Sequence, residues 1–161
     1  MIVPKQLLKS GNFFESADES QYQPCGVDVT LKSVLAFTSP GKIDFDNKDR
    51  KISDVSSIEF TNDEILLLPG SYKVQFNEYV KIPSDTAALC LPRSSLLRCG
   101  ATLSCAVWDP GYEGRSEALL IVHNPYGITF KKNAKIGQMI FIKLSDETES
   151  LYSGIYKGEN K

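Results

Sequence analysis

The segment Pro92-Arg93-Ser94-Ser95-Leu96 brings a guanidinium and two hydroxyls together where an apolar stretch gives way to an expected short helix. Arginine donates paired N–H groups that match phosphate oxygens, and the unpaired backbone N–H groups of a first helical turn attract anions. The segment is therefore a candidate phosphate site. A simpler structural role also fits, in which Ser94 caps the helix and Arg93 is solvated.

A second candidate is the segment Ala106-Val107-Trp108-Asp109-Pro110-Gly111-Tyr112-Glu113-Gly114. A carboxylate held at the edge of a strand can orient a water molecule for attack, which makes Asp109 a candidate general base. Tyr112 offers a flat face to a ring, and Gly114 permits close approach of the backbone. The structural alternative is that Asp109 only forms the Pro-Gly turn that follows it.

The elements that must position these residues are mostly strands. Alternating apolar and polar residues predict strands at 27–31 and 72–76, and apolar runs predict shorter, more fully buried strands at 87–91, 118–122 and 139–142. Turn-forming Gly, Pro, Asn and Asp residues separate these runs at short intervals. Many short strands joined by turns predict an all-β barrel or sandwich.

Few segments favour helix or irregular structure. We expect short helices at 4–9 and 94–99, the second ending at Gly100, whose lack of a side chain suits a helix terminus. Residues 42–62 are polar and weakly periodic, which predicts a surface excursion or irregular hairpin. Residues 146–161 are too poor in apolar side chains to hold themselves in a core, so we expect them to be mobile.

Length and composition limit the possible functions. A chain of 161 residues suits one domain, and a net charge of −2 argues against sequence-independent nucleic-acid binding, while a small anionic ligand remains compatible with it. The longest apolar run, 118–122, is far too short to span a membrane, and the first residues show no secretory signal. We therefore expect a cytoplasmic protein with neither nucleic acid nor membrane as a partner. Four cysteines without a Cys-x-x-Cys pair, and a single histidine, argue against a zinc site and favour buried, reduced thiols.

Five short motifs occur in a fixed order along the chain. They are Pro24-Cys25-Gly26-Val27-Asp28, Arg93-Ser94-Ser95, Asp109-Pro110-Gly111-Tyr112-Glu113-Gly114, Lys135-Ile136-Gly137-Gln138 and Tyr152-Ser153-Gly154-Ile155-Tyr156-Lys157-Gly158. Their order and chemistry resemble the superfamily of trimeric dUTPases and dCTP deaminases over essentially the whole chain. The opening Met1-Ile2-Val3-Pro4 is similar to the deaminase-like dUTPases of archaeal type.

This resemblance implies an all-β, distorted jelly-roll (β-clip) barrel of the dUTPase type with one or two short helices. Residues 1–145 would form the dUTPase-like β domain, and residues 146–161 a flexible C-terminal arm that closes over the nucleotide. It also implies a homotrimer with active sites at the subunit interfaces. One subunit would supply the first, second and fourth motifs, and a neighbour the Asp109 hairpin.

The resemblance further assigns the groups that hold the phosphates of the substrate. Asp28 matches the aspartate that helps to hold Mg²⁺ through its water shell. The triphosphate-binding residues correspond to Arg93, Ser94 and Ser95. Gln138 matches a glutamine that contacts the phosphate or water network.

For the nucleoside half of the substrate, the resemblance assigns Asp109 as the residue that activates water. The hairpin backbone at Leu103, Ser104, Cys105 and Ala106 would read the pyrimidine edge. Tyr112 would pack under the deoxyribose and exclude a 2′-hydroxyl. The arm departs from the pattern of dUTPases, which end in a Gly-rich arm with Phe and Arg; here Tyr156 would stack on the base and Lys157 would reach a phosphate. The arm could instead be only a disordered, solubilising tail.

Two enzymes of this superfamily remain to be distinguished. Zinc-independent dCTP deaminases carry a glutamate ten positions after the hairpin aspartate, where this chain has Leu119, which cannot shuttle protons. We therefore expect a dUTP diphosphatase that yields dUMP and pyrophosphate. A dCTP deaminase or bifunctional enzyme is the alternative, since Arg98 matches the deaminase branch and Glu117 lies two residues from Leu119; these two residues could instead pair at a subunit interface. A catalytically silent nucleotide-binding protein is a more remote possibility.

Overall fold

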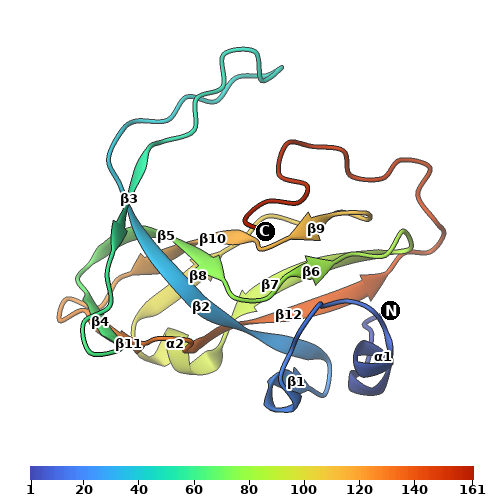
Figure 1. The fold of residues 1–161 in the computed structure, drawn as a ribbon, viewed down its shortest axis with the longest axis horizontal. Helices are drawn as coiled ribbons and strands as arrows, with labels where there is room; N and C mark the ends of the chain where they lie inside the picture. The colour runs from blue at the N-terminus through green and yellow to red at the C-terminus, as the bar shows by residue number, and fades with distance from the viewer.

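A computed structural model describes residues 1–161 as a nearly all-β protein (Figure 1), which confirms the expected fold class. Besides a 3₁₀ turn η1 (Glu19–Gln21), only α1 (Lys5–Ser10) and α2 (Ser94–Arg98) are helical. The strands are β1 (Tyr22–Gln23), β2 (Gly26–Phe37), β3 (Val55–Ile58), β4 (Glu64–Leu67), β5 (Gly70–Phe76), β6 (Val80–Lys81), β7 (Thr86–Pro92), β8 (Ala101–Ser104), β9 (Glu113–Gly114), β10 (Glu117–Val122), β11 (Ile128–Lys131) and β12 (Lys135–Lys143). With at most six residues, every helix is too short to reach across a bilayer.

The main sheet is antiparallel and curls until its two ends nearly meet. Its strands follow the order β7-β12-β2-β5-β10-β8, and β1 and β3 each pair with β2. Ala88 on β7 and Trp108, which follows β8, exchange backbone hydrogen bonds of 3.0 Å in both directions. The sheet is therefore an almost closed barrel. Two further sheets have two strands each, β4 with β11 and β6 with β9.

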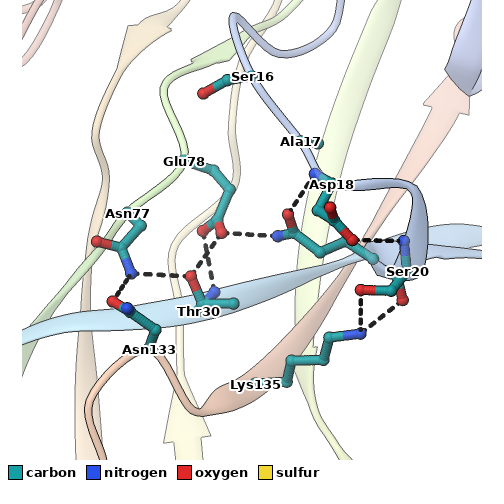
Figure 2. A pocket seen from close by; sticks show the side chains of 10 residues that line it. Ser16, Ala17, Asp18, Ser20, Thr30, Asn77, Glu78, Asn133 and Lys135 are labelled. Carbon is teal, nitrogen blue, oxygen red and sulfur yellow. Dashed lines mark hydrogen bonds between the residues drawn. The ribbon is translucent and has the colours of Figure 1, made fainter. Parts of the chain in front are cut away.

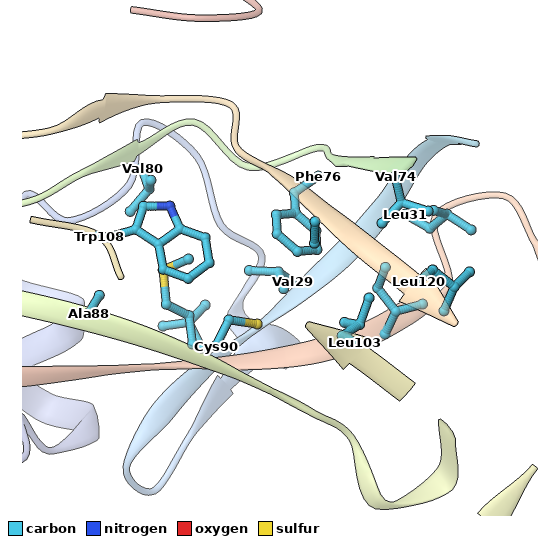
Figure 3. Close-up of a cluster of buried hydrophobic side chains, with 14 of the residues drawn as sticks. Val29, Leu31, Val74, Phe76, Val80, Ala88, Cys90, Leu103, Trp108 and Leu120 are labelled. Atoms are coloured by element: carbon cyan, nitrogen blue, oxygen red, sulfur yellow. The ribbon is translucent and has the colours of Figure 1, made fainter. Parts of the chain in front are cut away.

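The inward-facing side chains form one hydrophobic core (Figure 3). Val29 and Leu31 from β2, Phe76 from β5, Leu120 from β10 and Trp108 all belong to this core, and all are buried. Burying this apolar surface is the main favourable contribution to folding, at about 25 cal/mol per Å². The core fixes the strands on which both candidate sites stand.

Strand burial differs from the sequence expectation in two ways. β2 is buried on both faces at 26–31, not on one, because the N-terminal segment covers the face that carries Asp28 and Thr30. Conversely, β7 and β10 alternate between buried and more accessible residues, not fully buried ones. Leu89 and Leu91 on β7 are apolar and exposed. The continuous apolar run at 87–91 therefore does not mean that all of its residues are buried within one chain.

The remaining elements largely follow the sequence. The helix at 94–98 ends before Gly100, which has the left-handed φ of +77° that glycine adopts without strain. The excursion at 42–62 contains a projecting hairpin, bridged between Lys42 and Lys51, together with strand β3 (Figure 1). Of the four thiols only Cys90 is buried, so the expectation of buried cysteines is wrong for Cys25 and Cys99, which are exposed.

Candidate active site

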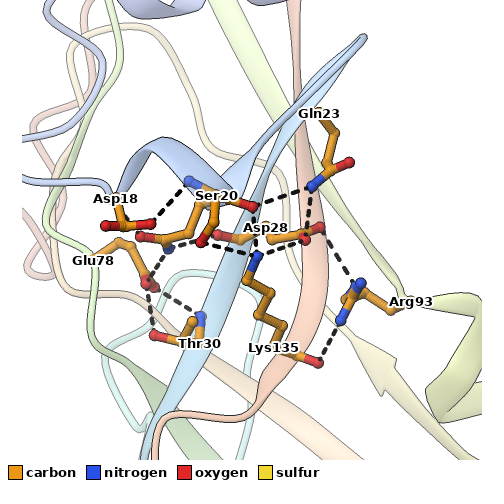
Figure 4. A network of polar contacts seen from close by, with 9 residues as sticks. Asp18, Ser20, Gln23, Asp28, Thr30, Glu78, Arg93 and Lys135 are labelled. Atoms are coloured by element: carbon orange, nitrogen blue, oxygen red, sulfur yellow. Dashed lines mark hydrogen bonds and ion pairs between the residues drawn. The ribbon is translucent and has the colours of Figure 1, made fainter.

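The adjacency of β2, β7 and β12 brings Asp28, Arg93 and Lys135 together (Figure 4), and it places Gln138 opposite Asp28. Asp28 is buried, with Arg93 Nε 3.5 Å from its Oδ1 and Lys135 Nζ 3.7 Å from its Oδ2. Gln138 is its register partner on β12. We call these four residues the phosphate cluster. The two nearby cations offset part of the cost of burying the Asp28 carboxylate.

Asp28 is also held from the N-terminal side. Gln23 Nε2 donates to Asp28 Oδ2 at 3.1 Å, and Gln21 Nε2 donates to the Asp28 carbonyl at 2.8 Å. Gln23 and Lys135 were not predicted as site residues. Lys135 stands in the fourth motif, which was the available signal, whereas nothing in the sequence pointed to Gln23.

Beside this cluster lies a polar cavity of about 610 Å³ around the buried Glu78 (Figure 2). The Glu78 carboxylate accepts hydrogen bonds from Gln21 Nε2 (2.7 Å), from the Thr30 backbone N–H (2.9 Å) and from the Thr30 hydroxyl (2.6 Å). A buried carboxylate costs free energy unless such donors satisfy it. Since Gln21 also binds the Asp28 carbonyl, this network fixes the strand that carries Asp28.

The candidate phosphate site at 92–96 lies where β7 passes into α2. Arg93 is the N-cap residue, its side chain makes no capping bond, and its backbone N–H donates to Ile136 O at 3.1 Å. The alternative in which Ser94 caps the helix is therefore wrong. Ser94 and Ser95 are exposed on the first turn of α2, and their hydroxyls make no hydrogen bond within the chain. These hydroxyls and N–H groups are free to meet an anion.

The Asp109 turn lies at the other end of β8. Asp109 is exposed, and its carbonyl accepts the backbone N–H of Tyr112 at 3.1 Å. Gly111 has a φ of +82°, and its N–H donates to Ile82 O at 2.9 Å. The turn is thus built as the sequence predicts, and it leaves the Asp109 carboxylate accessible to water.

Between β8 and the Asp109 turn, the hairpin formed by β8 and β10 loses its strand pairing. Leu103 and Ser104 pair with Leu120 and Leu119 on β10. The three residues after Ser104, at 105–107, then make no backbone hydrogen bonds at all. Ordered backbone donors and acceptors without partners are available to a polar ligand edge.

Tyr112 joins the hairpin to the C-terminal arm. It is buried, and its hydroxyl lies 3.1 Å from Ser116 Oγ and donates to Glu159 Oε1 at 2.7 Å. Its ring packs edge-on against Tyr152 of the arm, with 5.5 Å between the centroids. Burial raises the pKa of Tyr112 above its ordinary value.

The arm lies against its own chain. Tyr152 N donates to Pro110 O at 2.8 Å, Gly158 N to Glu113 O at 2.7 Å and Arg115 N to Glu159 O at 3.0 Å. Despite its polar composition, residues 151–160 therefore have defined partners. Its closure over a nucleotide stays a prediction.

The open hairpin and the arm together line a cavity of about 440 Å³, which we call the hairpin cavity. Asp109, Tyr112 and Ala106 line it, as do Lys73 and Glu117, whose charged groups were not assigned from the sequence. Its remaining lining residues are Ile52, Val107, Trp108, Ser116, Tyr152, Tyr156 and Glu159. No member of the phosphate cluster lines it, so one chain holds two separate regions, which we call the candidate half-sites.

The remaining predicted residues have varied positions. Tyr156 lines the hairpin cavity, and Arg50 stacks 6.0 Å from its ring centroid. Lys157 is exposed and does not line the cavity. Arg98 is exposed on α2, whereas Glu117 pairs with Lys73 at 2.8 Å, so no Arg98–Glu117 pair forms within the chain.

Leu119, the residue ten positions after Asp109, does not line the hairpin cavity. Leu119 on β10 stands opposite Ser104 and Lys73 and lines a neighbouring cavity of about 220 Å³. Glu117 borders both cavities. The only carboxylate that β10 offers to the hairpin cavity is therefore displaced by two residues from the deaminase position.

The residues around Asp28 fit a hydrated Mg²⁺ and not a metal enclosed by protein ligands. The chain holds no group of three His, Cys, Asp or Glu residues that could enclose a metal ion. Mg²⁺ binds proteins through one or two carboxylates and otherwise through water and substrate phosphates. A single buried Asp28, with only loose ion pairs of 3.5 and 3.7 Å, fits a hydrated ion that arrives with a triphosphate.

Known proteins resemble the chain along most of its length. The model of the dCTP deaminase-like family matches residues 5–144. A protein of Methanosarcina mazei named probable deoxyuridine 5′-triphosphate nucleotidohydrolase is 52% identical over 143 residues, covering 88% of this chain and 84% of the relative. One of the same name from Archaeoglobus fulgidus is 45% identical over 159 residues, covering 98% and 94%.

Structural comparison agrees on the fold. The crystal structure of 2′-deoxycytidine 5′-triphosphate deaminase from Agrobacterium tumefaciens superposes with a TM-score of 0.64 at 18% identity, covering 87% of this chain and 47% of that one. At that identity the likeness speaks for the barrel alone. The family match over residues 5–144 and the relatives at 52% and 45% identity show that this chain belongs to the dCTP deaminase-like family.

Proposed function

We propose that the protein is a dUTP nucleotidohydrolase that converts dUTP and water to dUMP and pyrophosphate. The observation that carries the proposal is the pairing of an accessible Asp109 at the hairpin cavity with an apolar Leu119 where a deaminase needs a glutamate. The names of archaeal relatives that share about half of its residues support the same activity.

In this proposal Asp109 acts on the attacking water. Its carboxylate accepts a proton while the water oxygen forms a bond to the α-phosphorus, and the bond from that phosphorus to the bridging oxygen breaks. Pyrophosphate leaves and dUMP remains. General-base catalysis of this kind contributes about 10²–10⁴-fold to the rate.

The phosphate cluster receives the triphosphate. Arg93 and Lys135 supply positive charge, Ser94 and Ser95 supply hydroxyl and backbone donors, and Gln138 completes the polar edge. Asp28 is the residue that would hold a hydrated Mg²⁺ arriving with the nucleotide, and the metal would supply positive charge against the phosphate oxygens. Charge stabilisation is the main contribution of a protein to phosphoryl transfer.

The hairpin cavity receives the nucleoside. The base lies against the hairpin segment formed by Leu103, Ser104, Cys105 and Ala106, whose free backbone groups face it. Tyr112 packs under the deoxyribose. Tyr156 stacks on the base, and Lys157 approaches the phosphates when the arm closes. An aromatic face against a base contributes about 1–3 kcal/mol.

The complete site requires a homotrimer, in which the phosphate cluster of one chain faces the hairpin cavity of the next. Two observations support this assembly. The two half-sites do not share lining residues within one chain, and Leu89, Leu91 and Val107 form apolar surface that the chain itself leaves exposed. Closed rings of identical subunits join two different surfaces of each chain in this way.

The second candidate function is deamination of dCTP, alone or with diphosphate release. Glu117 favours it, because its carboxylate reaches the hairpin cavity from β10. Its ion pair with Lys73 at 2.8 Å opposes it, because a general acid must first carry the proton that it donates.

Incubating the purified protein with Mg²⁺ and either dUTP or dCTP, and separating the products by chromatography, tests the proposal. We expect dUMP and pyrophosphate from dUTP, and neither dUTP nor dUMP from dCTP. Asp109→Asn provides the control for contaminating phosphatases. Release of dUTP from dCTP would assign the chain to the deaminases instead.

A further inference from the structure

A charge pair inside the hairpin cavity has no role in the hydrolysis described above. Lys73 on β5 and Glu117 on β10 lie 2.8 Å apart, and their side chains are only 23% and 26% exposed. Both line the cavity that also contains Asp109 and Tyr112. An ion pair in such a position costs desolvation, unlike one on an open surface.

Other groups fix this pair in place. Glu117 Oε1 accepts a hydrogen bond from Gln75 Nε2 at 3.0 Å and a longer one from Asn160 Nδ2 at 3.4 Å. Ser33 holds the same Gln75 by donating to its Oε1 at 3.0 Å. Burial opposes ionisation of Glu117, but the hydrogen bonds from Gln75 and Lys73 outweigh it and lower its pKa. The cavity therefore presents an ammonium and a carboxylate whose positions are fixed by their mutual ion pair and by Gln75.

Both groups keep hydrogen-bonding capacity for a ligand. An ammonium has three donors, and Lys73 directs one of them to Glu117. A carboxylate oxygen has two lone pairs, and Glu117 Oε2 uses one of them for Lys73. The cavity thus offers a donor and an acceptor side by side.

This order of groups complements uracil and not cytosine. Uracil presents an acceptor at O4 next to a donor at N3–H, whereas cytosine presents a donor at its 4-amino group next to an acceptor at N3. Placing cytosine against the same pair would oppose donor to donor and acceptor to acceptor. Unpaired polar groups in a binding site are costly, so such a reversal discriminates strongly.

We propose that Lys73 and Glu117 select the base, with Lys73 donating to O4 of uracil and Glu117 accepting its N3–H. This inference rests on the proposed dUTP hydrolysis and names the residues that set its preference over dCTP. It also gives Glu117 a role in the cavity other than proton transfer. The unpaired backbone at 105–107 then contacts the base from the opposite side of the open hairpin.

The test compares Glu117→Gln and Lys73→Met with the wild type, measuring kcat/KM for dUTP and for dCTP. An amide at position 117 would turn its oxygen to Lys73 and present N–H to the base. We expect the dUTP-to-dCTP ratio to fall at least tenfold in each variant, mainly through KM. An unchanged ratio in a folded variant would overturn the proposal.

Glu64 and Lys131 provide a matched control, because they form a cross-strand ion pair of the same residue types outside both half-sites. Glu64→Gln and Lys131→Met should leave the ratio unchanged. A fall of the same size in these controls would contradict the assignment.

Calorimetric titration with dUMP and dCMP separates this proposal from the proposed function. If the wild type hydrolyses no dUTP, the proposed function fails, but a preference for dUMP that Glu117→Gln removes still supports base selection. If the variants do not fold, 3-methyl-dUMP provides the test on the wild type, since it lacks the N3–H donor. Binding of 3-methyl-dUMP as tight as that of dUMP would overturn the proposal.

Discussion

The phosphate cluster and the hairpin cavity differ in how they are built. The phosphate cluster belongs to the main sheet, where β2, β7 and β12 hold Asp28 and its partners in register. The hairpin cavity instead lies between an opened hairpin and the C-terminal arm, and its aspartate is exposed. Strands of a packed sheet hold side chains more rigidly than turns and terminal segments do.

The two regions also differ in charge. The cations Arg93 and Lys135 outnumber the single carboxylate of Asp28 in the phosphate cluster. Around the hairpin cavity, Asp109, Glu117 and Glu159 outnumber Lys73. A polyanionic triphosphate is attracted to the first region and a neutral nucleoside with polar edges suits the second. The difference in charge suits the proposal that one dUTP molecule spans the two regions, with each region supplied by a different subunit.

The largest effect is expected from Asp109→Asn. The amide keeps the shape and the turn but cannot accept a proton, so kcat should fall by about 10²–10⁴-fold while nucleotide affinity stays near that of the wild type. Steady-state rates measure kcat, and calorimetric titration with a non-hydrolysable dUTP analogue measures the nucleotide affinity. Asp63→Asn, at an exposed turn outside both regions, serves as the control. Near-native turnover by Asp109→Asn would remove Asp109 from catalysis.

Subunit mixing tests whether the two regions belong to different chains. Asp28→Ala and Asp109→Ala proteins, each inactive alone, should regain about a quarter of the wild-type activity after random exchange in a closed ring. That fraction of sites combines an intact phosphate cluster with an intact hairpin. A fully active monomer in light scattering, or no recovery after proven exchange, would place both regions in one chain.

The sequence predicted the residues of both regions better than their surroundings. Asp28 and Gln138 stand in motifs that carry the family resemblance, and the structure places them opposite each other on β2 and β12. Short strands such as β6 and β9 have two residues each, too few for any periodicity to appear. Lys73 lies in an ordinary alternating strand, where nothing marks it as different from a solvated lysine.

Burial was the least predictable property, because it depends on segments far away in the sequence. The alternation at 27–31 predicts that Asp28 and Thr30 face solvent, yet both are buried. Gln21 and Gln23 contact Asp28 from a segment whose polar side chains gave no sign of packing, and Glu78 binds Thr30. Similarly, no pattern within 146–161 predicts that Glu159 bonds Tyr112. Such contacts arise from the tertiary fold and not from local periodicity.

A smaller effect is expected at the sugar. Tyr112 is buried against the arm, so Tyr112→Ala should narrow the preference for dUTP over UTP at least tenfold while also lowering affinity through lost packing. Rates with both nucleotides measure the ratio. Tyr22→Ala, a partly buried tyrosine of the N-terminal segment, is the matched control and should leave the ratio unchanged. Equal rates of the wild type on UTP and dUTP would contradict a role of Tyr112 in sugar selection.

The smallest effect is expected on stability at alkaline pH, and it concerns the link between hairpin and arm. Burial raises the pKa of Tyr112 above its ordinary 10.0, so the folded state favours the neutral phenol. The stability that results is fully present below pH 10 and is lost as pH rises from there towards the folded-state pKa. Thermal unfolding between pH 8 and 11 should therefore show a steeper decline of Tm in the wild type than in Tyr112→Phe, by a few degrees. Tyr126→Phe, at an exposed tyrosine, should follow the wild type. Parallel curves for the wild type and Tyr112→Phe would mean that the phenol is not held neutral by the arm, and the arm would then be docked by its backbone hydrogen bonds alone.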